Sequence, residues 1–110
     1  MNSAAKGNSA ELKTTKLLEA EGWVVGSRRH LAGPGDLLAV RATTWTGAPL
    51  EKPRLIEVKA RVHLWQGFRR EDRKALAEYC EEHGLVAQVA WWKPRARAPV
   101  YLGVAEWPTS

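Results

Sequence analysis

The fold of this chain is predicted most directly by two short segments, GDLLAV at 35–40 and LIEVK at 55–59. Both are apolar nearly throughout, which predicts strands at covered, central positions of a sheet. Residues two apart on a strand point to the same face, so Glu57 and Lys59 project together. A hairpin that pairs the two strands antiparallel would bring Asp36 beside them.

This juxtaposition indicates a metal-dependent chemistry. The carboxylates of Asp36 and Glu57 suit a hard divalent cation, which prefers oxygen ligands. The ammonium of Lys59 would lie within reach of an attacking water and of a phosphate oxygen. We therefore expect hydrolysis of a phosphodiester with Mg²⁺, for which Mn²⁺ substitutes. The structural alternatives are a turn residue for Asp36 and an exposed, alternately charged edge strand for Glu57 and Lys59.

Length and charge limit the class of protein. The chain has 110 residues, 45% of them hydrophobic, which predicts one globular domain over 1–110. The net charge is +5, the pI is about 9.7, and ten of the seventeen basic residues are Arg. Arg binds phosphate in a bidentate manner, so this balance favours a polyanion as partner, with plain solubility as the alternative.

The cellular compartment is predicted from what the sequence contains. A single cysteine, Cys80, excludes an internal disulfide and favours a reducing compartment. No segment is apolar enough for a membrane span, and the first residues have no apolar core of a signal peptide. We expect a cytoplasmic protein without a membrane partner, in the host cytoplasm if a phage encodes it.

The order of predicted elements indicates an α/β fold, a mixed central sheet flanked by helices in the order α-β-β-β-α-β-β. The helices are expected at Asn8–Gly22 and Arg69–His83, each ended by a glycine, Gly22 and Gly84. The strands are expected at Trp23–Val25, Asp36–Arg41, Arg54–Ala60, Leu85–Trp92 and Val100–Ala105, with loops at Ser27–Gly35, Thr43–Pro53 and Arg61–Phe68.

Glu11, on the first predicted helix, has two interpretations. It follows Asn8 by three residues, the spacing of a capping box, in which Glu11 would accept a hydrogen bond from a backbone N–H. It also lies beside Leu18 at the border of the core-facing side. From there a carboxylate can reach the edge of a metal site.

Four sequence elements occur in an order that resembles the PD-(D/E)xK nuclease superfamily and, within it, the archaeal-type Holliday junction resolvases, which also have phage members. The first element is Lys-Gly followed by Glu11, and the second is an amphipathic helix that ends in Gly22-Trp23. The third is a strand and an Arg/Ser turn before Asp36, and the fourth is Glu57-Val58-Lys59. The family often has Arg after the first Glu, where this chain has Leu12.

The resemblance implies a restriction-endonuclease-like core and a homodimeric Mg²⁺-dependent DNA endonuclease acting in recombination and repair. It would cut four-way junctions by paired symmetric nicks that leave 5′ phosphates. The alternatives are another nuclease of the superfamily (flap, nicking or restriction-type) and a non-catalytic DNA-binding module. The implied catalytic residues are Glu11, Asp36, Glu57 and Lys59, and the implied metal ligands are Asp36, Glu57, the carbonyl of Val58, and Glu11 in or behind the first shell.

Polar and basic residues near these motifs are candidates for DNA contact, with a solvated surface as the alternative. Gln66 follows the Lys59 strand where related nucleases place a supporting Gln. Acids are preferred at a helix start, so a basic opening of the second helix favours phosphate contact, although chance explains it equally well. Trp45, at a loop tip, is a candidate DNA wedge. The expected DNA-binding residues are Lys6, Ser27, Arg28, Arg29, Arg61, Gln66, Arg69 and Arg70.

Overall fold

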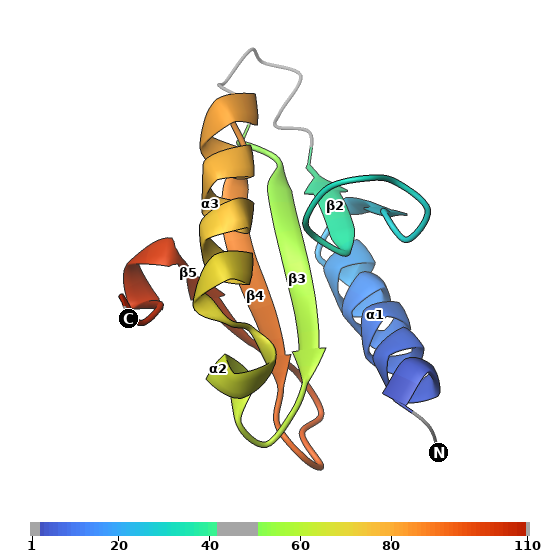
Figure 1. Ribbon diagram of the computed structural model, residues 1–110. Coiled ribbons are helices and arrows are strands. Elements are labelled where there is room, and N and C mark those ends of the chain that lie inside the picture. The colour runs from blue at the N-terminus through green and yellow to red at the C-terminus, as the bar shows by residue number, and fades with distance from the viewer. Residues whose placement is uncertain (1–2, 42–50, 110) are drawn as a thin grey trace.

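The computed structural model of the protein describes residues 3–41 and 51–109, with side chains from residue 9 onward. Within the described residues three helices accompany one sheet, and a short 3-10 turn lies near the C-terminus; Figure 1 shows their arrangement. The elements are α1 (Ser3–Ala20), β1 (Val24–Ser27), β2 (Leu37–Val40), β3 (Arg54–Ala60), α2 (Leu64–Gly67), α3 (Arg70–His83), β4 (Val86–Trp92), β5 (Val100–Gly103) and η1 (Val104–Glu106).

The five strands form one mixed sheet in the order β1-β2-β3-β4-β5. Neighbouring strands are antiparallel except β3 and β4, which are parallel. A parallel pair needs a crossover connection, and α2 with α3 supplies it between β3 and β4. The α/β class, the mixed sheet and the antiparallel β2–β3 pairing predicted from the sequence are confirmed.

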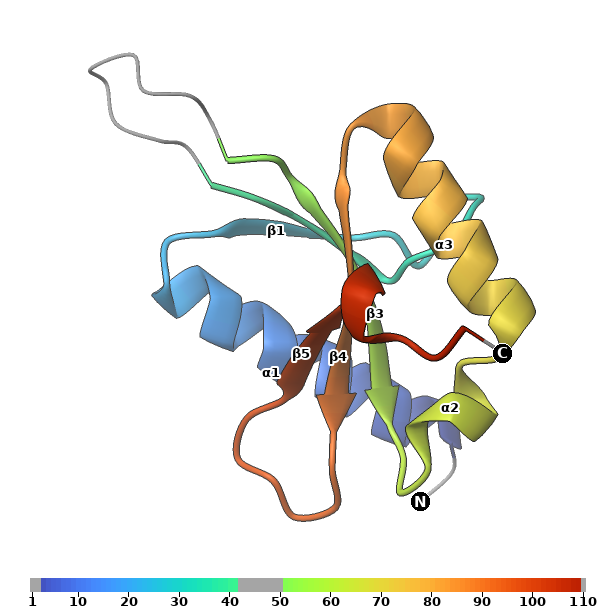
Figure 2. The same ribbon diagram turned by 90° about the vertical axis from the view of Figure 1, so that its left-hand side faces the viewer.

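Helices cover both faces of the sheet, α1 on one and α3 on the other (Figure 2). Leu18 of α1 packs in one buried cluster with Ile56, whereas Leu76 of α3 packs in a second cluster with Leu55. Successive residues of β3 therefore enter opposite layers, as the alternation of a strand requires. This explains why β3 is apolar in consecutive positions and why Glu57 shares the face of Leu55.

The helix ends show where sequence prediction succeeds and where it is wrong. Gly22 and Gly84 have φ of 93° and 69°, the left-handed conformation of glycines that end helices. The first helix, however, begins at Ser3 rather than Asn8, because the intervening Ala and Lys residues favour helix. Asn8 is therefore not an N-cap, and the capping-box interpretation of Glu11 is wrong.

The segment 61–68 contains α2 and is not the predicted loop throughout. Its one turn is held by burial, since Leu64 is 2% exposed and Phe68 is 1% exposed. Phe68 lies in the core and packs edge-on against Trp107, so its side chain is not exposed for contact with a second protomer. No helix in the described ranges is long and apolar enough to cross a membrane.

Candidate active site

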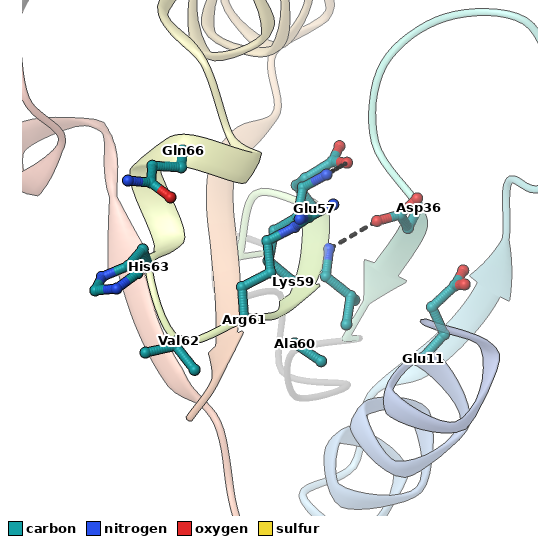
Figure 3. Close-up of a pocket in the computed structure, with 10 residues that line it drawn as sticks. Glu11, Asp36, Glu57, Lys59, Ala60, Arg61, Val62, His63 and Gln66 are labelled. Carbon is teal, nitrogen blue, oxygen red and sulfur yellow. Dashed lines mark hydrogen bonds and ion pairs between the residues drawn. The ribbon is translucent and has the colours of Figure 1, made fainter. Parts of the chain in front are cut away.

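The four predicted catalytic residues line one cavity of about 530 Å³ at the point where β2 and β3 part (Figure 3). Glu11 lies on α1, Asp36 directly precedes β2, and Glu57 and Lys59 lie on β3. Val58, Arg61 and Gln66 also line the cavity. The structure thus brings Glu11 and Lys59 into one cavity although they are 48 positions apart in the sequence.

Asp36 is held by two hydrogen bonds to β3. Its backbone N–H donates to the Ile56 carbonyl at 2.9 Å, and its Oδ2 accepts from the Val58 N–H at 2.7 Å. The side chain therefore extends the β2–β3 ladder by one rung beyond the Leu37–Ile56 pair. Oδ1 is the oxygen that this arrangement leaves for a ligand.

Gly35 makes that position of Asp36 possible. Its φ is +91°, and a Cβ built there would lie 2.6 Å from the Leu55 side chain. Any other residue would be strained in its backbone and would overlap the core beneath it. The Gly35 backbone also favours the charged form of the Glu57 carboxylate and so opposes the rise of its pKa.

Glu57 is a carboxylate in an unfavourable electrostatic environment. Its side chain is 18% exposed, and Lys59 Nζ lies 3.5 Å from its Oε1. Burial, followed by the charge of Asp36, raises the pKa of Glu57 to about 7, against the opposing effects of Lys59 and the Gly35 amide. Two acids that repel each other at a partly buried site are a donor set that fits a divalent cation.

The Val58 carbonyl is directed to the same place. In an extended strand the N–H and C=O of one residue point to the same side, and the Val58 N–H donates to Asp36. The carbonyl therefore points to the side of β3 on which Asp36 lies, and Val58 lines the cavity. Asp36, Glu57 and this carbonyl make a set of three oxygen donors suited to Mg²⁺.

Glu11 lies at the rim of this set. Its side chain is 17% exposed and lies 3.7 Å from Arg29 Nη2. Burial and then the charge of Asp36 raise its pKa, and Arg29 opposes the shift. Among residues 3–41 and 51–109, no group of three or more His, Cys, Asp or Glu side chains is placed to hold a metal ion. Glu11 is therefore positioned behind the Asp36–Glu57 pair rather than as a third acid beside them.

The predicted DNA-binding residues divide into those near the cavity and those away from it. Arg61 and Gln66 line the cavity. The Arg61 side chain lies against Gly67, and a Cβ added to Gly67 would overlap it. Arg29 is beside Glu11, and its N–H donates to Ser27 Oγ at 3.2 Å.

The remaining predicted contacts have other partners. Arg28 donates to the Ala32 carbonyl at 3.0 Å and lies over the Tyr79 ring, so it ties the β1–β2 loop to α3. Arg69 pairs with Asp72 at 3.6 Å. Arg70 is exposed at the first position of α3, the side chain of Lys6 lies outside the described residues, and so does Trp45.

His63 is a cavity residue that sequence analysis missed. It precedes α2 and lines the cavity together with Val62. Its position four residues after Lys59 could have indicated that it lies near the cavity. The segment was predicted to be a loop, and this proximity was not considered. The contribution of Gly35 was missed as well, since it depends on contact with Leu55.

A comparison with solved structures identifies the fold. The chain is similar to the 1.6 Å structure of Archaeoglobus fulgidus Hjc, a Holliday junction resolvase from an archaeal hyperthermophile, with a TM-score of 0.67. The chain has the fold of this resolvase. The match covers 91% of this chain and 74% of the other at 22% sequence identity, so the likeness is one of fold. No family model matches the chain, and no curated protein matches it in sequence.

Proposed function

We propose that the protein is a metal-dependent DNA endonuclease that resolves four-way junctions. The observation that carries the proposal is the meeting of Asp36, Glu57 and Lys59 in one cavity. The resolvase fold supports it, because the Archaeoglobus protein with this fold is a Holliday junction resolvase. The basic charge of +5 supports a nucleic acid as the substrate.

In this proposal Asp36 Oδ1, Glu57 and the Val58 carbonyl would hold Mg²⁺, which would supply Lewis acidity toward the phosphoryl oxygen and toward water. Glu11 orients water from the rim of the cavity. Lys59 positions the attacking water and stabilises the negative charge that develops on the phosphate, while its contact with Glu57 fixes the direction of its ammonium. The water oxygen bonds to phosphorus and releases a proton to solvent, the bond from phosphorus to the 3′ oxygen breaks, and the 3′ oxygen takes a proton from solvent, which leaves a 3′ hydroxyl and a 5′ phosphate.

A homodimer is the expected active form. A four-way junction has two-fold symmetry, and two symmetric nicks require two active sites. A C₂ dimer supplies them with one site in each protomer. Light scattering at the assay concentration should then give twice the chain mass of 12.3 kDa.

A cleavage panel tests the proposal. Wild type is incubated with a four-way junction, a Y-fork, a linear duplex and a supercoiled plasmid, each in Mg²⁺ and in EDTA. Asp36→Ala is compared with Asp72→Ala, which removes the only other Asp of the chain, an exposed one paired with Arg69. We expect paired nicks in the junction in Mg²⁺ alone, abolished by Asp36→Ala and retained by Asp72→Ala.

Each alternative has its own signature in this panel. Equal cleavage of all substrates, or cleavage of the linear duplex at one sequence, would replace junction resolution by another nuclease activity. Junction binding without any cleavage in Mg²⁺ or Mn²⁺ would indicate a non-catalytic binding module. Near-wild-type cleavage by Asp36→Ala would refute the assignment of the site.

A further inference from the structure

A second cavity, of about 280 Å³, adjoins the candidate active site. Ala60 and Arg61, at the end of β3, line both cavities. The second cavity lies between α1 and the loop that joins β4 to β5, which are at the same end of the molecule in Figure 1. A ligand that occupies the first cavity can therefore continue into the second.

The lining of this cavity combines an apolar floor with a basic rim. Trp92 forms part of the floor and is fixed there, since its Nε1 donates to Thr14 Oγ1 at 2.8 Å. No carboxylate is present among the described residues that line it, in contrast to the acidic first cavity. The cations of its rim are Lys13, whose Nζ lies 5.9 Å from the Trp92 ring centre, and Arg95. Lys93 and Arg61 also line the cavity, but the Lys93 ammonium lies over Trp91 and the Arg61 side chain lies against Gly67.

Arg95 occupies this rim at a conformational cost. The Ala96 N–H donates to the Lys93 carbonyl at 3.1 Å, which closes a turn with Pro94 in its second position and Arg95 in its third. Arg95 has φ of +64° and is the only non-glycine residue with positive φ in the described ranges. The third position of such a turn favours Gly or Asn. A charged residue in a strained turn beside a candidate active site is a signal of function.

We propose that this cavity binds the sugar–phosphate backbone of the DNA strand that flanks the cleaved phosphate. This inference rests on the proposed function. The apolar floor accommodates deoxyribose, and Lys13 and Arg95 contact neighbouring phosphates, while Ala60 and Arg61 border both cavities. This second cavity, called the groove below, contacts no base. It therefore contributes to the affinity for DNA of every shape and to the path of the strand.

The test measures DNA binding in EDTA, where no cleavage occurs, by fluorescence anisotropy from 50 to 200 mM salt. Arg95→Gly removes the charge and suits the turn, and Arg97→Gly in the same loop is its matched control, because Arg97 is exposed and does not line the cavity. Lys13→Ala is paired with Lys16→Ala, the next lysine of α1, in the same way. Thermal unfolding of each variant reports on folding.

We expect Arg95→Gly to leave the unfolding temperature unchanged or raised, because it relieves the positive φ. Its Kd should rise by about five- to tenfold at 0.1 M salt, and the log–log salt slope should flatten by about 0.9, the value for one lost phosphate contact. Lys13→Ala should behave likewise, and Arg95→Lys should restore most of the affinity. The two control variants should lose much less.

Equal losses of DNA affinity in Arg95→Gly and Arg97→Gly would refute the proposed groove. Wild-type affinity and salt slope in Arg95→Gly would refute it as well, and so would an absence of DNA binding by the wild type. These outcomes are independent of catalysis. A wild type that binds through Arg95 but nicks no substrate in Mg²⁺ would leave the groove standing and refute the endonuclease. A wild type that resolves junctions while Arg95→Gly and Lys13→Ala bind normally would refute the groove alone.

Discussion

Replacing Glu57 by Gln should stabilise the metal-free protein at neutral pH. The pKa of Glu57 is about 7 in the folded state against an ordinary value of 4.5, because burial and Asp36 disfavour its charge. The unfolded chain therefore releases this proton first as the pH rises. The contribution of Glu57 to the free energy of unfolding of the wild type is fully present below pH 4.5 and is lost as the pH rises through about 7. Gln keeps the shape and an acceptor for the Gly35 amide without the charge.

The size of the effect follows from the two pKa values. Each unit of difference between the two pKa values corresponds to about 1.4 kcal/mol, so the difference from 4.5 to about 7 sets an upper limit of about 3.5 kcal/mol for full ionisation at this site. The side chain is 18% exposed, so residual solvent lowers the expected difference to about 2 kcal/mol at pH 8. At pH 4.5 the two proteins should differ by less than about 0.5 kcal/mol.

Urea unfolding in EDTA at a series of pH values measures this difference directly. Glu19→Gln serves as the control, because it removes one acid from the exposed side of α1 and should give a small difference that does not change with pH. Added Mg²⁺ should then stabilise the wild type more than Glu57→Gln, by about 1.4 kcal/mol at ten times its Kd. A Glu57→Gln variant that is less stable than wild type at pH 8 in EDTA would refute the electrostatic account of the site.

Three further predictions concern single residues. Lys59→Ala should lower the junction cleavage rate at saturating DNA by roughly 100-fold or more while Kd changes far less, since it removes one electrostatic or acid–base group; weak binding with a normal saturated rate would contradict this. Gly35→Ala should cost about 2–4 kcal/mol in urea unfolding, from positive φ plus overlap with Leu55, whereas Gly84→Ala, which has positive φ and open space, should cost about 1 kcal/mol; equal losses would exclude the overlap. Cys80 should resist alkylation at pH 8 until the protein unfolds, because burial raises its pKa to about 11; rapid labelling of the native protein would show an accessible thiolate.

The central strands and the helix stops could be predicted because local sequence determines them. The expected bounds of Arg54–Ala60 match those of β3, since a strand buried on both faces must be apolar in consecutive positions. Gly84 marks the end of α3 because few other residues adopt its conformation. In both cases the physical cause lies within a few residues of the signal.

Features that depend on distant contacts could not be predicted in this way. The single turn of α2 is too short to be stable by propensity and exists because Leu64 and Phe68 are buried. Arg28 is a candidate phosphate ligand by sequence, yet its long side chain lies over Tyr79, more than fifty positions away. The partner of a flexible basic side chain is decided by tertiary packing, so its position near a motif carries little information.

At the end of β3, features that local sequence determines lie beside features that tertiary contacts determine. An acidic cavity and a basic one adjoin here, and both Ala60 and Arg61 border the two. The acidic residues are specified by short motifs, because the chemistry requires fixed residue types on adjacent strands. The basic residues come from a helix and a hairpin loop, where many arrangements can supply a cation to a phosphate. A motif can therefore indicate the chemistry of this site, whereas the proposed path of a DNA strand has to be inferred from the three-dimensional arrangement of Lys13 and Arg95.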